Sequence, residues 1–532
     1  MFSDISDIET GAINGDICLV GAGAAGISLA KQFLNSPHKV ILLEAGGLEY
    51  EESTQALYRG ESEGLMYFPL ASARLRYFGG STGHWGGACT PLDAIDFEKR
   101  GWLPHSGWPF QRTELEPYYP MAQKICGIGP FDYRTEYWSD PETSPALPLA
   151  DTGIQSRIIQ NSNPPLRFGT AYRTDLEDAE NIQVVLHANV LEFVADTENE
   201  NITGVNARNI DGRRLHVKAR IYVLCAGGLE NPRLMLLSNK QYPQGIGNHN
   251  NLVGRYFMEH IYVSDAGKLM LSEPRNMKLY ERHNVNGTDI RTGLCLSQDA
   301  QRSDKLMNAW VGFKLKGAPS SQRRYSSLNY LKRSIRNGEI PEDLWRHIGA
   351  VIDDLGDHIK RKFTDDKPKK RKDKTIIGFS THSEQAPNPE SRVHLGEDID
   401  EFGQRTLVLD WRLTDIDHAS VRKTLELMAH GFGMADLGRI MTEFSGNDDG
   451  WATQDSTQGN TTPSGSFHQM GTTRMHSSAK EGVVDSNLKV HGLNNMYVAG
   501  SSVFPTCGWS NPTLTIVALS CRLADHLKLT LS

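Results

Sequence analysis

The chain has 532 residues, of which 39% are hydrophobic and 23% charged, and its formal net charge is -8. This length exceeds what one hydrophobic core normally organises, so we expect a globular protein of two domains. The negative charge argues against a general affinity for nucleic acid, and no apolar run is long enough to span a membrane. The N-terminus has no basic region followed by an apolar run, so we expect no signal peptide and a cytoplasmic location.

The seven cysteines are scattered along the chain and contain no CxxC pair. Their odd number and wide spacing argue against a disulfide framework and against a zinc site. They favour a reducing compartment, and we expect no bound metal.

The N-terminal region predicts one βαβ unit. The apolar run DICLV at 16–20 indicates a buried strand, and the glycine-rich GAGAAG follows it directly. A helix with one apolar face is expected from Ile27 onward, and KVILL at 39–43 indicates a second buried strand that ends at Glu44.

GAGAAG has the spacing of a dinucleotide-binding loop. Gly21 permits the tight turn, Gly23 lets the backbone approach a pyrophosphate, and Gly26 lets the helix pack close to the strand. The free N–H groups of a helix N-terminus favour the anionic pyrophosphate. Glu44 lies where a carboxylate would bind an adenosine ribose, which disfavours a 2′-phosphate. The loop alone leaves FAD and NAD open.

Further along, the predicted secondary-structure pattern changes twice. A strand pair is expected over 181–196 and 202–212, with Asp211-Gly212 as its turn. Residues 265–460 are less regular, and RVHLGED and RTLVLDWRLT within them indicate strands of a mixed sheet. The basic run from Lys360 to Lys374 is interpreted as a solvated surface loop, with an anionic partner or membrane surface as the alternative. The segment from 494 onward again predicts a strand, a loop and a helix, as the N-terminal region does.

These patterns predict an α/β protein with a Rossmann-like nucleotide domain and a second, substrate-binding domain on a mixed β-sheet. The nucleotide domain is expected at 13–264, with a loop-rich cofactor-covering segment at about 60–140. The substrate domain is expected at 265–464, and 465–532 should rejoin the nucleotide domain.

Four motifs in order resemble the glucose-methanol-choline (GMC) oxidoreductases, an FAD-dependent family of alcohol oxidases and dehydrogenases. They are GAGAAG with Glu44, GGSTGHWGG at 79–87, EQAPNPESRVHL at 384–395, and FHQMGTTRM at 467–475 with the segment that follows. The likeness spans nearly the whole chain. It is strongest to the branch of pyranose oxidases and bacterial sugar or glycoside dehydrogenases.

The resemblance implies two catalytic residues. His468 corresponds to the family's catalytic base, and alcohol oxidation needs a base whose pKa is near neutrality. Asn511 corresponds to a position that holds histidine or asparagine and pairs with that base across the substrate oxygen. Asn511 also precedes Pro512 and a helix, so an N-cap role is a structural alternative that is compatible with the catalytic one.

The resemblance also implies a set of cofactor contacts. In some related sugar oxidases, the histidine that corresponds to His84 bonds covalently to the flavin. Noncovalent FAD is favoured here. Many relatives have aspartate where Gly500 stands, so the contact of that aspartate is replaced or lost in this chain. The expected FAD-binding residues are Gly21, Gly23, Ala24, Ala25, Gly26, Glu44, Ala45, Gly79, Gly80, Ser81, His84, Trp85, Gly86, Gly87, Val190, Ala226, Gly227, Gly500, Ser501, Asn511, Pro512 and Thr513.

The activity implied is oxidation of a secondary hydroxyl of a sugar or glycoside to a ketone. A non-sugar alcohol is one alternative, and a lyase or decarboxylase of the same fold, without net alcohol oxidation, is another. The sequence leaves open whether oxygen, a quinone or a redox protein takes the electrons, and whether the chain forms a homo-oligomer or binds a small accessory subunit.

Overall fold

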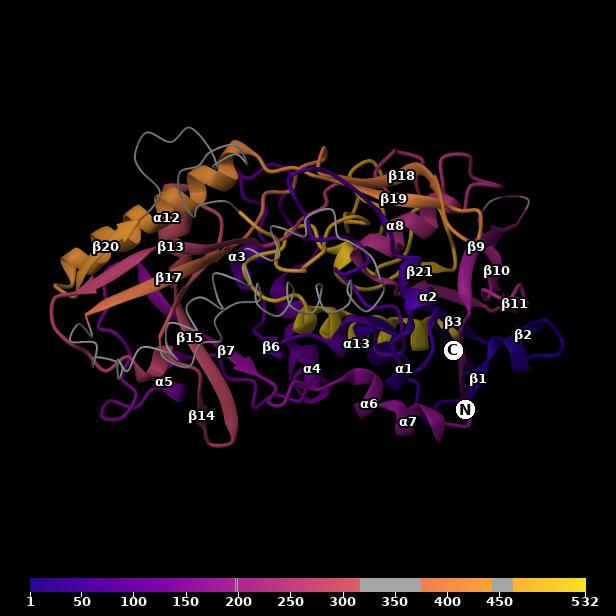
Figure 1. The fold of residues 1–532 in the computed structure, drawn as a ribbon, viewed down its shortest axis with the longest axis horizontal. Coiled ribbons are helices and arrows are strands. Elements are labelled where there is room, and N and C mark those ends of the chain that lie inside the picture. The colour runs from indigo at the N-terminus through magenta and orange to yellow at the C-terminus, as the bar shows by residue number, and fades with distance from the viewer. Residues whose placement is uncertain (197, 199, 316–374, 443–462) are drawn as a thin grey trace, which may run out of the picture.

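A computed structural model describes residues 1–196, 198, 200–315, 375–442 and 463–532. The molecule is elongated, with two sheet regions side by side along its long axis (Figure 1). The basic run at 360–374 lies outside the described residues. No helix among the described residues has the length and apolar character needed to cross a membrane.

A six-stranded sheet, in the order β1-β8-β4-β3-β12-β21, forms the nucleotide-domain core, and all its strand pairs are parallel. Strands β3, β4 and β12 at its centre are continuous runs of buried apolar residues, as a parallel sheet covered on both faces requires. The strands are β1 (Phe2–Asp4), β3 (Ile17–Val20), β4 (Val40–Leu43), β8 (Ile182–Leu186), β12 (Ile221–Leu224) and β21 (Met496–Val498).

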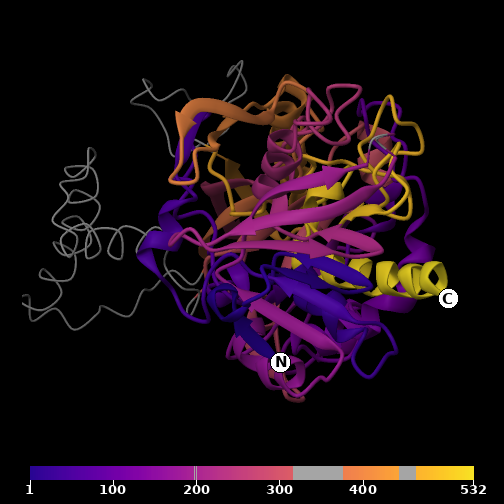
Figure 2. The same ribbon diagram turned by 90° about the vertical axis from the view of Figure 1, so that its right-hand side faces the viewer.

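Two helices from opposite ends of the chain pack together beside this sheet, as Figure 2 shows for the long C-terminal one. They are α1 (Ala24–Lys31) and α13 (Thr513–Leu531). Strand β21 pairs with β12, and helix α13 packs on α1, so the end of the chain lies beside the N-terminal strands. The expected strand at 181–196 is in fact two strands in different sheets, because the chain turns at His187, which has φ 54°.

The second of those strands belongs to a four-stranded sheet, β2-β11-β10-β9. Its strands are β2 (Ala12–Asn14), β9 (Asn189–Ala195), β10 (Ile202–Arg208) and β11 (Arg214–Lys218). Strands β9 and β10 pair as expected, while the Asp211-Gly212 turn, with Gly212 at φ 93°, joins β10 to β11.

The largest sheet has eight strands, and every pair in it is antiparallel. Helix α12 (Asp415–Met434) packs its Val421, Leu425, Met428 and Phe432 into the core of this sheet. The strands are β6 (Ala88–Cys89), β7 (Ile154–Asn161), β13 (Ile261–Leu271), β14 (His283–Val285), β15 (Thr288–Leu296), β16 (Ala309–Phe313), β17 (Ile376–Ser383) and β20 (Gly438–Thr442).

The mixed sheet is a smaller, three-stranded one. Strands β18 (Arg392–Ile399) and β19 (Arg405–Trp411) are the two strands expected there, and β5 (Gly60–Gly64) adds to β19 in parallel. The domain boundaries remain a prediction, and the eight-stranded sheet draws β6 and β7 from the stretch assigned to the nucleotide domain.

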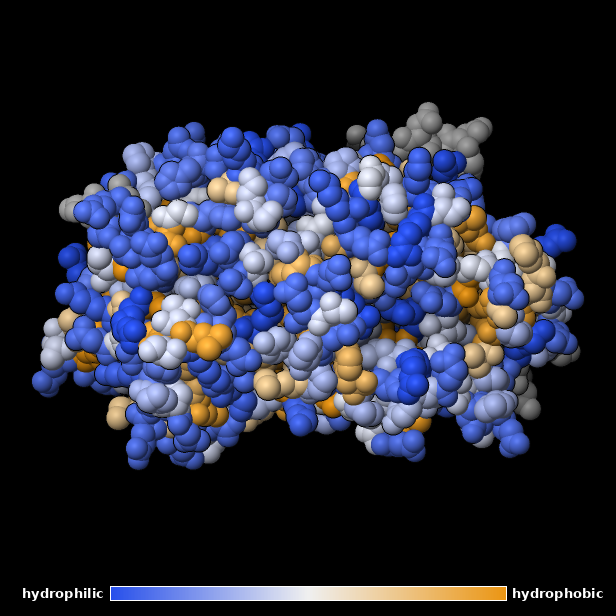
Figure 3. Space-filling view, turned by 180° about the vertical axis from the view of Figure 1, so that it is seen from behind, coloured by the Kyte–Doolittle hydropathy of each residue, from blue (hydrophilic) through white to orange (hydrophobic). Residues whose placement is uncertain are grey.

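Short helices fill the connections between the strands. They are α2 (Glu52–Ala56), α3 (Ala94–Phe97), α4 (Tyr119–Cys126), α5 (Thr135–Trp138), α6 (Phe168–Ala171), α7 (Arg173–Glu177), α8 (Gly227–Leu237) and α9 (Gln298–Asp304), with 3₁₀ turns η1 (Ile5–Asp7), η2 (Gly80–Gly83), η3 (Arg112–Glu114), η4 (Glu116–Tyr118), η5 (Lys278–Tyr280) and η6 (Ser501–Val503). All seven cysteines are buried and free. The face seen in Figure 3 is mostly hydrophilic, with small separate apolar patches.

Candidate active site

Two glycine-rich loops lie against each other at the end of β3. The Gly79 N–H donates to the Ala22 carbonyl over 2.9 Å, and a Cβ on Gly80 would lie 3.1 Å from the Gly23 Cα. Gly21 has φ 103°, which favours glycine, and a Cβ on Gly26 would lie 1.9 Å from the Gly21 carbonyl oxygen. The roles expected of Gly21 and Gly26 therefore match the observed packing, and 79–83 joins the same site.

Three glycines of this region face open space. A Cβ added to Gly23, Gly227 or Gly500 would meet no atom of the described residues within 4 Å. They follow β3, β12 and β21, which are neighbouring parallel strands, so they stand together at the carboxyl edge of the sheet. Ligands of such sheets bind at this edge. The space over these glycines fits the pyrophosphate and ribityl chain of FAD.

The Glu44 carboxylate lies beside the first loop. Its oxygens accept hydrogen bonds from the Ala22 N–H at 2.9 Å and the Gly46 N–H at 3.0 Å. Burial raises the pKa of Glu44, while these bonds and the Arg76 guanidinium oppose the rise. Carboxylate oxygens have lone pairs left for a ribose, so the expected ribose contact stays a prediction, and that of the neighbouring Ala45 stays one with it.

The loop at 79–87 holds the residue expected to contact the flavin ring. His84 is exposed, yet the surrounding protein and the Arg167 guanidinium lower the pKa of its imidazole, which favours the neutral form. Trp85 is half-buried, donates its indole N–H to the Leu166 carbonyl and packs edge-on to Phe168.

The remaining expected contacts lie around the same edge. Val190 is buried on β9, the outer strand of its sheet, and the Ala226 N–H bonds the Asn231 side chain. The Ser501 hydroxyl donates to the Gln469 carbonyl over 2.7 Å, which ties the turn after Gly500 to the residue beside His468.

His468 lies in a cluster of three histidines. His260 and His382 come from the start of β13 and from β17, which are paired strands, and bridges from Met258 to Met470 and from Tyr262 to Ser464 bring the His468 segment alongside. The Nδ1 atoms of His260 and His468 are 2.8 Å apart. Burial and the neighbouring imidazoles lower the pKa of all three histidines well below 6.5, so they are neutral at pH 7.

Hydrogen bonds account for five of the six ring nitrogens. His382 bonds the Trp509 carbonyl and the Ser466 hydroxyl, and His260 Nε2 faces the Cys507 carbonyl at 3.4 Å. Nε2 of His468 has no partner within the described part of the chain, and this side chain keeps partial exposure. The ligand atoms of the three histidines lie within 4.8 Å of one another, but a metal ion would have to displace these bonds.

The buried Glu259 carboxylate binds the backbone of both His260 and His468. Glu259 accepts from the N–H groups of His260 and His468 and from the Tyr67 hydroxyl, at 2.7–3.0 Å. Burial raises the Glu259 pKa to about 7 despite these bonds. Phe467 has φ 62°, a strained value for a residue with a side chain, and its ring stacks on another aromatic ring. Hydrogen bonds and ring stacking thus hold the backbone around His468 in place.

Asn511 is not an N-cap. Helix α13 begins at Thr513, Pro512 occupies the cap position, and no side chain bonds the first turn. The structural alternative therefore fails, because Asn511 stands one residue too early. Its half-buried amide makes no hydrogen bond to any described residue and remains available for a substrate.

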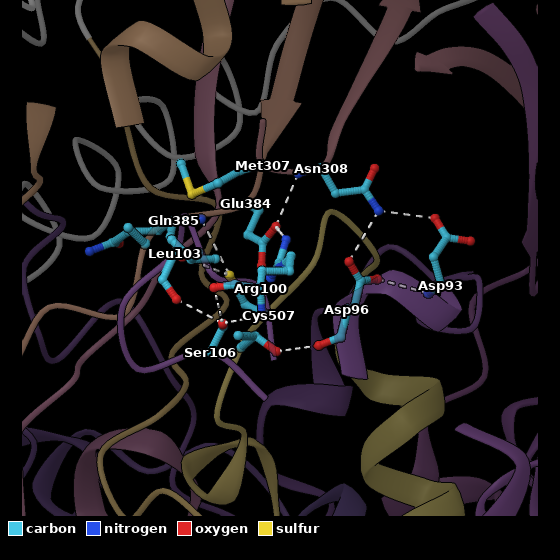
Figure 4. A network of polar contacts seen from close by, with 12 residues as sticks. Asp93, Asp96, Arg100, Leu103, Ser106, Met307, Asn308, Glu384, Gln385 and Cys507 are labelled. Atoms are coloured by element: carbon cyan, nitrogen blue, oxygen red, sulfur yellow. Dashed lines mark hydrogen bonds and ion pairs between the residues drawn. The ribbon is translucent and has the colours of Figure 1, made fainter. Parts of the chain in front are cut away.

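The loop that leads to Asn511 is anchored in a buried polar network (Figure 4). The Arg100 guanidinium bonds the Glu384 carboxylate in two places, and both side chains are fully buried. The Cys507 thiol contacts the Gln385 backbone, and the Thr506 hydroxyl donates to the Asp96 carbonyl. These contacts hold the 505–511 loop in place.

Three residues of this site were not singled out from the sequence: Glu259, His260 and His382. His260 is 208 residues from His468, and no spacing along the chain marks their contact. Only the pairing of β13 with β17 and with the 464–470 segment brings them together.

Comparisons with known proteins agree with this geometry. Two family models, both described as GMC oxidoreductase, match residues 168–262 and 387–520. Similar curated proteins include 2-methyl-1,2-propanediol dehydrogenase of Mycolicibacterium austroafricanum (24% identical, covering 98% of this chain and 96% of that protein) and 6'''-hydroxyparomomycin C oxidase of Streptomyces lividus (24%, 96% and 92%). The large subunit of fructose dehydrogenase from Gluconobacter japonicus is 22% identical over 97% of this chain and 98% of its own length.

The same fold occurs in pyridoxine 4-oxidase from Mesorbium loti, with a TM-score of 0.55, 15% identity, and coverage of 97% of this chain and 99% of that chain. The matched family models, the full-length relatives and the shared fold agree with the four motifs and the α/β architecture expected from the sequence. The chain carries both the N-terminal and the C-terminal domain of the GMC oxidoreductase family models.

Proposed function

We propose that this protein is an FAD-dependent enzyme that oxidises a secondary hydroxyl of a sugar or glycoside to a ketone. The observation that carries the proposal is His468, a neutral histidine whose Nε2 has no partner among the described residues, near a loop with an uncommitted Asn511 amide. His468 accepts the hydroxyl proton, and Asn511 donates a hydrogen bond to the same oxygen. When bound, FAD supplies the hydride acceptor.

The substrate class rests on the relatives. An aminoglycoside-intermediate oxidase and a fructose dehydrogenase each align with nearly the whole chain, which supports a sugar or glycoside. The diol dehydrogenase supports the second candidate, a non-sugar alcohol. Anaerobic mixing with panels of glycosides and of short diols distinguishes them, because only a substrate bleaches the flavin absorbance. A lyase would bleach with none of them.

The test of the base is the variant His468→Ala. General base catalysis contributes roughly 10²–10⁴-fold, so the anaerobic rate of flavin reduction should fall by about that factor. Substrate affinity should change far less, because the proton moves mainly in the transition state. Reduction at the wild-type rate, with FAD fully bound, would show that the base lies elsewhere.

The cofactor proposal has its own test. The purified protein should be yellow and release FAD on acid denaturation, because we propose noncovalent binding in the space over Gly23, Gly227 and Gly500. Colour that stays with the precipitate would point to a covalent bond, and His84→Ala should then release the flavin. A colourless protein, or one that releases NAD, would contradict FAD binding.

A further inference from the structure

The contact between His260 and His468 joins two like atoms. Their Nδ1 atoms are 2.8 Å apart, which is hydrogen-bond distance. A neutral imidazole carries a proton on one ring nitrogen and a lone pair on the other. The contact therefore requires that one Nδ1 is protonated and the other is not.

The backbone beyond His260 decides which one it is. His260 Nε2 faces the Cys507 carbonyl oxygen at 3.4 Å, and backbone hydrogen bonds to Cys507 and Gly508 oppose the lowering of the His260 pKa. A carbonyl oxygen only accepts hydrogen bonds, so Nε2 of His260 must carry the hydrogen. Because the buried His260 is neutral, its Nδ1 then has only a lone pair.

We propose that His260 is a positioning residue that holds His468 in the Nδ1–H tautomer, which leaves Nε2 of His468 as the free base for the substrate hydroxyl. The inference rests on the proposed role of His468. The opposite arrangement would aim the bare Nε2 of His260 at carbonyl oxygens and place a hydrogen on the nitrogen that must accept the proton. An acid side chain orders the working histidine in the same way in hydrolytic triads.

Hydrogen bonds hold the loop that carries the Cys507 carbonyl in place. The Cys507 thiol lies 3.4 Å from the Gln385 N–H, and the Thr506 hydroxyl bonds the Asp96 backbone within the network of Figure 4. Glu259 fixes the other end, because it binds the backbone N–H of both His260 and His468. The series of hydrogen bonds from the Cys507 carbonyl through His260 to His468 is thus held in place at both ends.

Two variants with side chains of similar shape distinguish the loss of a hydrogen-bond acceptor from the loss of side-chain volume. In His260→Asn, the amide oxygen can accept from His468 Nδ1, whereas His260→Leu offers no acceptor. We expect His260→Leu to slow anaerobic flavin reduction about 10- to 100-fold, by analogy with the loss on removing the hydrogen-bond partner of a metal-ligating histidine, with little change in substrate Kd. His260→Asn should recover most of that loss.

The control variant is His526→Asn, which removes a half-buried imidazole on α13 about 20 Å along the helix from its first turn. It should reduce at the wild-type rate. Equal rates for His260→Leu and wild type, or equal losses for His260→Leu and His260→Asn with FAD fully bound, would overturn the proposal.

A measurement on the unmodified holoenzyme does not depend on whether the variants fold. The ¹⁵N spectrum of histidine-labelled protein, with the His468 signals assigned by their loss in His468→Ala, should show a protonated Nδ1 and a bare Nε2. The reverse pattern would refute the tautomer assignment. If His468→Ala instead keeps full activity, the proposed base is wrong, and that outcome is distinct from a wrong tautomer.

Discussion

Asn511 shows how a single residue can be read in two ways until a boundary is known. From the sequence, Asn-Pro before an apolar helix fits both a cap and a catalytic pair. The helix starts at Thr513, two residues later, and leaves the amide without a partner among the residues described. Boundaries of this kind shift by a residue or two between sequence and structure, and here the observed boundary argues against the cap and leaves the catalytic role as a proposal.

We therefore expect Asn511→Ala to slow flavin reduction while leaving stability nearly unchanged. One hydrogen bond to a buried, charged oxygen contributes about 1–3 kcal/mol, which corresponds to roughly 5- to 150-fold in rate. Asn511→Asp should be slower than Asn511→His, because a negative charge opposes the developing alkoxide. Stopped-flow reduction and thermal melts of the three variants provide the test. A loss of stability matching the loss of rate would assign Asn511 a structural role instead.

The histidines mark the limit of inference at the residue scale. His468 was identified because it stands in a local motif, FHQMGTTRM. No local motif marks His260 or His382. Their ring nitrogens bond carbonyls of a loop more than 120 residues away. Contacts of that kind depend on the register between strands, which a single sequence does not display.

Among the elements, buried parallel strands and the long C-terminal helix were predictable because their apolar runs are continuous. Short strands such as β1, β5 and β6 were not, because each has two to five residues and owes its existence to a neighbour. The pairing of the large sheet was not predictable either, since its strands β6 and β7 come from far upstream in the chain.

The network under the 505–511 loop yields a prediction for this element. In Glu384→Gln the fully buried Arg100 keeps its charge but loses its counter-ion. Breaking one partner of a buried ion pair destabilises a protein by about 3–5 kcal/mol. We expect the lower end of that range, because the nearby Asp96 carboxylate also attracts Arg100 and is relieved of the Glu384 charge.

The matched control is Glu390→Gln, which removes a carboxylate that pairs with Arg255 but is 66% exposed. An exposed pair contributes about 0–1 kcal/mol, so its unfolding midpoint in urea should barely move. Equal midpoints for the two variants would show that the buried pair does not anchor the loop.

At the scale of the whole molecule, the cofactor region is assembled from both ends of the chain. Strands β3, β12 and β21 are adjacent in one sheet although they start at residues 17, 221 and 496. A Cβ on the glycines after them, Gly23, Gly227 and Gly500, would meet no described atom within 4 Å, and all three lie at the carboxyl edge of the sheet. A ligand seated there contacts all three segments at once, so its binding should stabilise the assembled fold against the unfolded chain.

We expect added FAD to raise the melting temperature of the flavin-free protein and Gly23→Ala to abolish most of that rise. Binding to the native state alone stabilises it by about 2.7 kcal/mol when free ligand is roughly 100 times Kd. A Cβ on Gly23 meets no protein atom within 4 Å and the residue has an ordinary φ of -86°, so the apoprotein should fold with equal or slightly higher stability. The same methyl group would occupy the space proposed for the pyrophosphate.

Gly433→Ala is the matched control, because a Cβ there also meets no protein atom within 4 Å, and Gly433 lies on α12, outside the proposed FAD-binding loops. Its FAD-dependent rise in melting temperature should equal that of the wild type. If the flavin proves covalent, the series is run in the His84→Ala background, where the apoprotein can be prepared. A Gly23→Ala protein that melts with the full FAD-dependent shift would place the pyrophosphate away from this loop. A variant that melts lower without FAD would instead show that the loop needs glycine for its own packing.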